Sequence, residues 1–118
     1  MEPINGVHIL GRVYVPGGLT LRPTAWYVEE ILKVIRGNGL TPVGSPGSFD
    51  FEGGGFTAFF MLAESHLSLH TWIELGFVDL DVFVCNVTRD NSDKARLIFR
   101  EVGSLFEAVK IKAQEIFR

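Results

Sequence analysis

The sequence predicts an α+β fold, a two-layer sandwich in which two helices cover one face of a mostly antiparallel sheet. Several short segments are rich in β-branched and aromatic residues and alternate between apolar and polar positions, as strands do. Two longer segments repeat apolar residues every three or four positions, as amphipathic helices do. Their order is βαβββ(β)αβ within 118 residues, which is the length of one domain. We therefore expect residues 1–118 to form a single domain.

The first strand is predicted over residues 7–15, where Gly11 is a candidate for a β-bulge. A turn at residues 15–18 follows, and Thr24 is a candidate N-cap for the first helix. Both glycines around Asn38 favour the end of that helix, since Gly and Asn tolerate positive φ. The apolar face of this helix is expected to comprise Ala25, Val28, Ile31, Leu32 and Ile35.

The middle of the chain contains most of the predicted sheet. Residues 40–43 suggest a short strand, residues 44–55 a Gly-, Pro- and Ser-rich loop, and residues 56–63 a central apolar strand. Residues 67–75 and 77–85 alternate cleanly and predict two further strands. One face of this pair is expected to carry Ser68, His70, Trp72, Glu74, Phe77, Asp79, Asp81, Phe83 and Cys85.

A second helix is expected to begin at Asn91 or Ser92, and residues 108–117 predict the last strand. The apolar stripe of this second helix comprises Ala95, Ile98, Phe99, Val102, Leu105 and Phe106. Two helices leave one face of the sheet uncovered, and His70, Trp72, Phe77 and Phe83 lie on that face. Exposed aromatic side chains of this kind predict a partner, and we expect a homodimer packed near them.

Composition excludes several classes of protein. The net charge of −3 argues against a nucleic-acid-binding protein, and no apolar run is long enough to cross a membrane. The first residues lack the pattern of a signal peptide, so we expect a cytoplasmic protein. The only cysteine, Cys85, cannot form an internal disulfide or a cysteine-only zinc site.

Polar groups are densest in residues 64–72, which contain two serines, two histidines and a glutamate. A hydrolytic Ser-His arrangement is one interpretation, although the fold and not sequence proximity assembles a catalytic triad. A metal site of His66, His70 and Glu74 is another, but residues four apart on a strand lie about 13 Å apart, which is too far for one zinc ion. Without further information, His70, Cys85 and Thr57 are equally compatible with ordinary structural roles.

Three blocks of sequence, at residues 51–57, 64–74 and 81–85, resemble motifs of the prokaryotic S-adenosylmethionine decarboxylase proenzymes, a family of self-cleaving pyruvoyl enzymes. The segment ESHLSLHTWIE at residues 64–74 resembles the self-cleavage motif. Residues 81–85 resemble Asp-x-Phe-x-Cys, and residues 51–57 resemble Phe-x-x-x-Gly-x-Ser, with Thr57 in place of the serine. The resemblance covers the chain from about Gly6 to its end.

The resemblance implies cleavage between Glu64 and Ser65, with Ser65 converted into the pyruvoyl cofactor. A carbonyl of this kind accepts the electrons released by decarboxylation. It also implies that Thr57 polarises the reacting carbonyl, that His70 is the base for β-elimination, and that Cys85 returns a proton to the substrate carbon. No metal is implied.

By the same resemblance the substrate is S-adenosylmethionine, decarboxylated for spermidine and polyamine synthesis, and the site lies near a dimer interface with residues from both copies. Phe51 and Trp72 are candidates for contact with the adenine, and Glu74 is a candidate for contact with the ribose.

The chain departs from the family pattern at Val7, Val15-Pro16, Gly53 and Ile73. Two alternatives therefore stay open: the same chemistry on arginine, with Glu74, Asp79 or Asp81 as ligands, and an unprocessed, non-catalytic dimeric relative.

Overall fold

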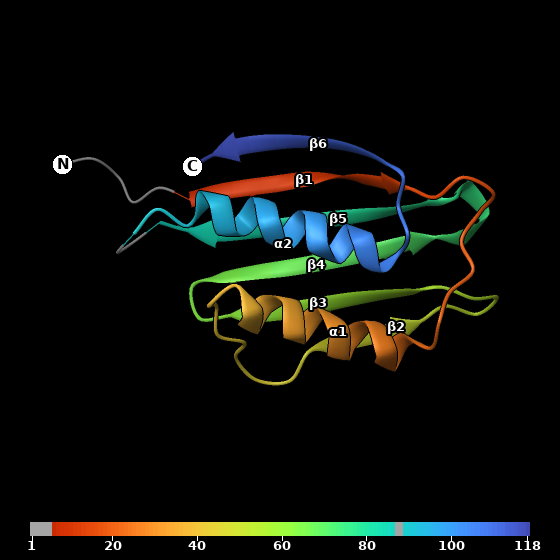
Figure 1. Ribbon diagram of the computed structural model, residues 1–118. Coiled ribbons are helices and arrows are strands. Elements are labelled where there is room, and N and C mark those ends of the chain that lie inside the picture. Colours follow the sequence, from red (N-terminus) through yellow and green to blue (C-terminus); the bar gives the residue numbers. More distant parts are fainter. Residues whose placement is uncertain (1–5, 87–88) are drawn as a thin grey trace.

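The computed structural model describes residues 6–86 and 89–118, in which two helices lie on one face of a six-stranded sheet (Figure 1). The sheet order is β2-β3-β4-β5-β1-β6, and every neighbouring pair is antiparallel. The elements are β1 (Gly6–Tyr14), α1 (Thr24–Gly37), β2 (Gly47–Asp50), β3 (Phe56–Leu62), β4 (Ser65–Trp72), the 3₁₀ turn η1 (Ile73–Leu75), β5 (Phe77–Cys85), α2 (Ser92–Leu105) and β6 (Lys110–Phe117). The predicted α+β two-layer fold is confirmed.

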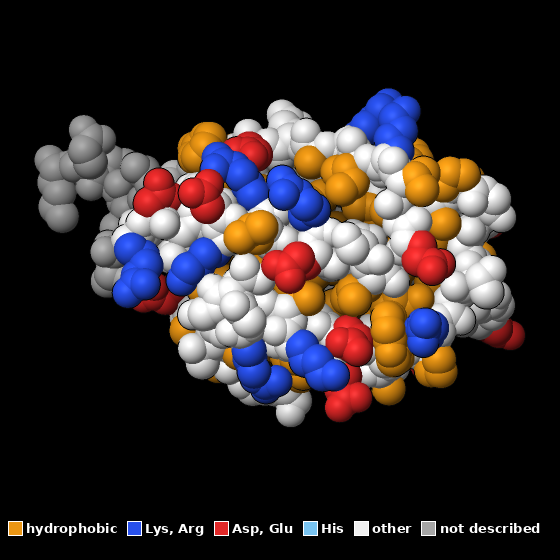
Figure 2. Space-filling model, in the orientation of Figure 1, with side chains coloured by type: hydrophobic (Ala, Val, Ile, Leu, Met, Phe, Trp, Pro, Cys, Tyr) orange, Lys and Arg blue, Asp and Glu red, His pale blue; other side chains and the backbone are white. Residues whose placement is uncertain are grey.

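The core lies between the helices and the sheet. Every second residue of β1, β3, β4 and β5 points into it, which is the alternation expected of strands with one buried face. Tyr27 of α1 stacks on Phe106 with ring centroids 4.5 Å apart and also packs against Phe56, so it joins α1, the sheet and the end of α2. The outer surface of the helical layer carries charged side chains of both signs (Figure 2).

The opposite face of the sheet, here called the open face, is covered by no described element (Figure 1). Phe49, Phe59 and Met61 on this face are 56%, 45% and 48% exposed, although such residues are usually buried. The open face is thus apolar at β2 and β3, rich in histidine and aromatic rings in its middle, and charged at β1 and β6.

The strand predicted over residues 40–43 is wrong, and so is the prediction that residues 44–55 are loop throughout. Only Pro42 makes an isolated bridge, to Leu62, through hydrogen bonds from Val43 N–H to the Met61 carbonyl and from Ala63 N–H to the Thr41 carbonyl. The strand that pairs with β3 on the side away from β4 is β2, in the register from Gly47↔Phe59 to Asp50↔Phe56. Its glycine and serine gave no strand signal in the sequence.

Gly11 is not a bulge, since β1 pairs without interruption with β5 and with β6. Glycine is needed there because a Cβ would lie 2.3 Å from the backbone oxygen of Lys112. The prediction of Thr24 as N-cap is also wrong: Pro23 takes that position, and the Thr24 hydroxyl donates to Asp50 at the end of β2. Asn91, one of the two predicted caps, does precede α2.

Both helices have 14 residues, and among residues 6–86 and 89–118 no helix is long and apolar enough to span a membrane. The apolar stripe of α2 is buried as predicted, except that Leu105 is half-buried. In α1, Ala25 is exposed and the core position is taken by Tyr27, because the helix presents Tyr27, Ile31 and Ile35 to the sheet.

Candidate functional site

The predicted cleavage bond lies at the tip of a β-hairpin. Leu62 of β3 pairs with Ser65 of β4, so Ala63 and Glu64 form a two-residue turn between them. Both turn residues are exposed. The bond between Glu64 and Ser65 therefore joins an exposed turn to the first residue of an ordered strand.

Ser65 lies beside Cys85, the last residue of β5. The backbone N–H of Cys85 donates to Ser65 Oγ at 3.3 Å. The Cys85 carbonyl in turn accepts from the Asn91 side chain at 3.0 Å, which anchors this strand end to the start of α2. The Cys85 side chain is a half-buried free thiol, and by alternation it belongs to the open face. The structure thus brings together two of the three predicted catalytic residues.

His70 lies at the other end of β4, opposite Thr57 of β3. Its imidazole packs between Phe51 and Trp72, with ring centroids at 4.8 and 4.5 Å. The Thr57 hydroxyl donates to the Leu69 carbonyl at 2.9 Å. One cluster is therefore formed by Thr57, His70, Phe51 and Trp72. The order of the blocks in the sequence does not by itself reveal this cluster.

A glycine turn directs Phe51 onto His70. Gly53, Gly54 and Gly55 have φ values of 93°, 109° and 91°, a region that side-chain-bearing residues rarely adopt. The turn is closed by hydrogen bonds between Phe51 and both Gly54 and Gly55. Gly53 departs from the family pattern without opening this turn.

The predicted site residues form two groups that are far apart within one chain. Ser65 and His70 are five residues apart on β4, which corresponds to about 17 Å along a strand. Thr57 is separated from the hairpin turn by the same number of residues on β3. Within one copy, neither His70 nor Thr57 reaches Ser65 along the strands.

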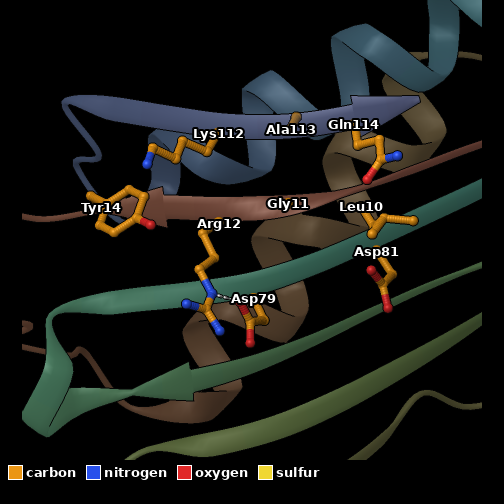
Figure 3. Close-up of a pocket in the computed structure, with 9 residues that line it drawn as sticks. All are labelled: Leu10, Gly11, Arg12, Tyr14, Asp79, Asp81, Lys112, Ala113 and Gln114. Carbon is orange, nitrogen blue, oxygen red and sulfur yellow. Dashed lines mark hydrogen bonds and ion pairs between the residues drawn. The ribbon is translucent and has the colours of Figure 1, made fainter.

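Asp79 and Arg12 belong to the His70 cluster, and sequence reasoning did not assign them to it. The Trp72 indole N–H donates to Asp79 Oδ2 at 3.1 Å, and Arg12 Nε donates to Asp79 Oδ1 at 2.8 Å (Figure 3). The hydrogen bond with Asp79 raises the pKa of Arg12 above its usual value. Both oxygens of Asp79 are therefore engaged, which leaves this carboxylate poorly suited to the cationic-ligand role considered above.

Glu74 does not share the sheet face of His70 and Trp72, so that prediction is wrong. Strand β4 ends at Trp72, and Glu74 is an exposed residue of η1. It lines a groove with Tyr14, the loop at residues 15–18 and Lys110. A role of Glu74 as a ribose ligand remains a prediction.

His66 lies on the open face beside the Ser65 group. Its ring packs against Phe59 and Phe83, each with centroids 5.6 Å apart, and lies 6.4 Å from His8. Burial, followed by the nearby His8, lowers the pKa of His66, while Asp81 opposes the shift. Among residues 6–86 and 89–118, no cluster of three or more His, Cys, Asp or Glu side chains could hold a metal ion, so the metal alternative has no support.

Comparison with known proteins identifies the family. The sequence model of S-adenosylmethionine decarboxylase matches residues 19–118. The S-adenosylmethionine decarboxylase proenzyme of Pyrobaculum aerophilum is 42% identical over 86 residues, covering 70% of this chain and 66% of that protein. The proenzyme of Pyrobaculum islandicum is 34% identical over 114 residues, covering 93% and 85%.

A solved structure agrees with the sequence matches. The adenosylmethionine decarboxylase from Aquifex aeolicus superposes with a TM-score of 0.77 at 25% identity, covering 98% of this chain and 91% of that one. The chain therefore belongs to the S-adenosylmethionine decarboxylase family of pyruvoyl-dependent lyases.

Proposed function

We propose that this chain cleaves itself between Glu64 and Ser65 and then decarboxylates S-adenosylmethionine, at a site completed by a second copy of the chain. The observation that carries the proposal is the hairpin, in which the bond to be cut lies at an exposed turn and the Ser65 hydroxyl is held by the Cys85 backbone N–H. The product would be an aminopropyl donor for polyamine synthesis.

Self-cleavage uses only atoms of the chain and one water molecule. The Ser65 hydroxyl attacks the Glu64 carbonyl, and the Ser65 nitrogen departs as an amine, so the amide becomes an ester. Removal of the Ser65 α-proton then expels the Glu64 carboxylate and leaves a carbon–carbon double bond. Isomerisation to an imine and hydrolysis release ammonia and leave a pyruvoyl group at the start of the second chain.

Ser65 fits the requirements for this precursor. Its hydroxyl is half-buried at a strand end and receives one backbone hydrogen bond, which orients it and leaves it free to donate its own proton. The exposed turn before it can change conformation when the chain is cut, because the β3–β4 ladder ends at Leu62 and Ser65 and Ala63 takes part only in the isolated bridge of Pro42, through its N–H bond to the Thr41 carbonyl.

The base and the carbonyl-polarising hydroxyl are inferred to come from a second copy. An imidazole suits proton abstraction near neutral pH, and a hydroxyl can donate to a developing oxyanion. Because His70 and Thr57 lie about 17 Å along the strands from Ser65, they suit the Ser65 of another chain. The exposed Phe49, Phe59 and Met61 support a partner on the open face.

One symmetry axis satisfies this requirement. The cross-strand row of Phe59, Ser68, Asp81, Leu10 and Gln114 runs across the sheet about midway between Ser65 and His70. Packed sheets lie about 10 Å apart, so a two-fold axis that relates two open faces lies midway between them. If that axis runs parallel to this row, the strands of the second copy are reversed end to end relative to those of the first. The hairpin end that carries Ser65 and Cys85 would then lie against the end that carries His70, Trp72 and Phe51 of the second copy. A two-fold axis parallel to the strands would place like ends together and complete no site.

In the matured enzyme the pyruvoyl carbonyl would bind the substrate amine and accept the electrons left by carbon dioxide. Cys85 is the proposed proton donor to the substrate carbon, since its thiol lies at the same end of the sheet as Ser65. Phe51 and Trp72 present aromatic faces to which a purine or a sulfonium cation can bind. Glu74 is proposed to accept hydrogen bonds from the ribose.

Intact mass and a denaturing gel test the proposal. The purified chain should separate into fragments of 64 and 54 residues, and Ser65→Ala should remain whole because it has no hydroxyl with which to form the ester. Carbon dioxide release should be assayed on S-adenosylmethionine and, separately, on arginine. A wild-type chain that never splits would contradict the proposal, and release from arginine alone would overturn the substrate assignment.

A further inference from the structure

A continuous series of contacts runs from Arg12 through Asp79 and Trp72 to His70. We propose that the pair of Arg12 and Asp79 positions the His70 imidazole by fixing the Trp72 ring against it. This inference rests on the proposed function, because it assigns a purpose to the orientation of His70. Neither Arg12 nor Asp79 touches Ser65, so both are positioning residues.

The His70 ring depends on its neighbours for its orientation. Among residues 6–86 and 89–118, no side-chain hydrogen bond reaches the imidazole, although an imidazole in a fixed pose usually has one. Its position is set by two ring contacts, with Phe51 on one side and Trp72 on the other. A change in the Trp72 ring angle would therefore pass directly to the base.

Trp72 is held by Asp79. Indole has one N–H donor, and in Trp72 that donor is used by Asp79 Oδ2 at 3.1 Å. The Trp72 ring also packs on Phe77, with centroids 6.2 Å apart, but a ring contact alone permits sliding and rotation. The hydrogen bond selects one orientation of the indole. Asp79 lies directly opposite His70 in the β4–β5 ladder, so the carboxylate needs only its short side chain to reach Trp72.

Arg12 in turn orients Asp79. The two residues are directly opposite each other in the β1–β5 ladder, and Arg12 Nε donates to Asp79 Oδ1 at 2.8 Å. The guanidinium also lies 4.1 Å from the centroid of the Phe77 ring, which fixes its plane. Figure 3 shows the Arg12 and Asp79 side chains pointing toward each other from adjacent strands. One carboxylate oxygen is thereby committed to Arg12, and the other faces Trp72.

If the pair of Arg12 and Asp79 served only to stabilise the fold of one chain, its contribution would be small. The Arg12 and Asp79 side chains are 49% and 38% exposed, and ion pairs with such exposure contribute little to folding stability. The chain offers a matched comparison in Arg96 and Glu115, which are similarly exposed and join α2 to β6 on the helical side. The first pair differs from the second in its link to Trp72 and His70 and in its position on the open face.

The experiment measures the rate of self-cleavage on denaturing gels, together with the NMR resonances of His70. Asp79→Ala should slow cleavage by roughly 10- to 100-fold, as expected when a reacting group is misplaced by about an ångström. Trp72→Phe should slow it similarly, and the double variant should be little slower than either single one. Asp79→Asn should recover only part of the rate, because its one amide oxygen can accept from Trp72 but then leaves the amide NH2, a donor, facing Arg12.

The exchanged pair Arg12→Asp with Asp79→Arg separates positioning from stability. It should restore the ion pair and the melting temperature but not the rate, since an arginine cannot accept the indole N–H. Glu115→Ala should cleave within about twofold of the wild-type rate, a difference too small to indicate lost positioning.

A wild-type rate in Asp79→Ala, or full rescue by the exchanged pair, would overturn the inference. If the wild-type chain does not cleave at all, the proposed function fails separately, and the NMR measurement then decides. An unchanged His70 resonance in Asp79→Ala would overturn the positioning role, and a shifted one would support it.

Discussion

Ser65 and His70 lie on the same strand, five residues apart, so one is at the hairpin end of β4 and the other at its opposite end. This separation of about 17 Å is fixed by strand geometry and cannot be removed by side-chain rotation. Any reaction that uses both groups at one bond therefore requires two chains. If both groups act at the bond between Glu64 and Ser65, as proposed, self-cleavage requires a dimer that packs through the open face.

Mixing two inactive variants tests this requirement. Ser65→Ala keeps His70 but has no nucleophile, and His70→Ala keeps Ser65 but has no base, so neither should release fragments alone. After the two are unfolded and refolded together, mixed dimers would pair an intact Ser65 with an intact His70 from the other chain. Up to one intact site per mixed dimer should form, and only the His70→Ala chain should be cut, which mass spectrometry can identify. A mixture that stays uncut would show that both groups must come from one chain.

Loss of His70 and loss of Cys85 should have different consequences. His70→Ala should stop after ester formation, because the base for the Ser65 α-proton is missing, and hydroxylamine should then cleave the chain at Ser65. Cys85→Ala should still mature, since elimination needs no proton from the thiol. Its rate of carbon dioxide release should fall by roughly 10²- to 10⁴-fold, the usual effect of losing a general acid. Full activity in Cys85→Ala would assign that proton transfer to another group or to water.

A charge on the open face should prevent assembly. Phe59 lies in the central row and is 45% exposed, so Phe59→Asp should leave the fold of one chain intact while burying a carboxylate in the interface. The dimer dissociation constant should rise by about 100-fold or more, measured by analytical ultracentrifugation, and maturation should slow with it. Leu97→Asp is the matched control, because Leu97 is 44% exposed but belongs to α2 on the opposite layer. Equal effects of the two substitutions would argue against the open face as the interface.

The layers of the fold could be predicted from the sequence because each layer has its own periodicity. Strands β4 and β5 alternate so regularly that their open-face residues, apart from Glu74, follow from the sequence. Strand β2 could not be predicted, since Gly47 and Ser48 have low strand propensity and pair only because β3 offers them an edge. The end of β4 could not be predicted for a different reason. The alternation of residue types continues to Glu74, but the chain leaves the strand after Trp72 in a 3₁₀ turn that Gly76 closes in a left-handed conformation.

The resemblance names the residues of the proposed site and implies that both copies contribute to it, but it does not say which residues lie at which end of the sheet. The sequence motif places Ser65 and His70 close together in the chain, and only strand extension shows that they point to different ends of the sheet. The role of Asp79 was equally hidden, since its alternation with Asp81 indicates the face but not the partner. The ladder places Arg12 and His70 on either side of Asp79, and the hydrogen bond with Trp72 follows from that placement.

The lowered pKa of His66 should make folding stability depend on pH. Burial and the nearby His8 lower the pKa of the folded imidazole, whereas in the unfolded chain it titrates near 6.5. As the pH falls through about 6.5, the unfolded state binds the proton more readily than the folded state does, so the free energy of unfolding should decrease. His66→Phe removes this pH-dependent contribution to the free energy of unfolding and supplies a ring that can still pack against Phe59 and Phe83. Urea unfolding at pH 7.5 and 5.5, carried out with Ser65→Ala chains to prevent cleavage, should show a smaller loss of stability in the His66→Phe variant than in its parent. The two chains differ only at residue 66, so the difference between the two losses isolates His66, and equal losses would mean that His66 is protonated as readily in the folded state as in the unfolded one.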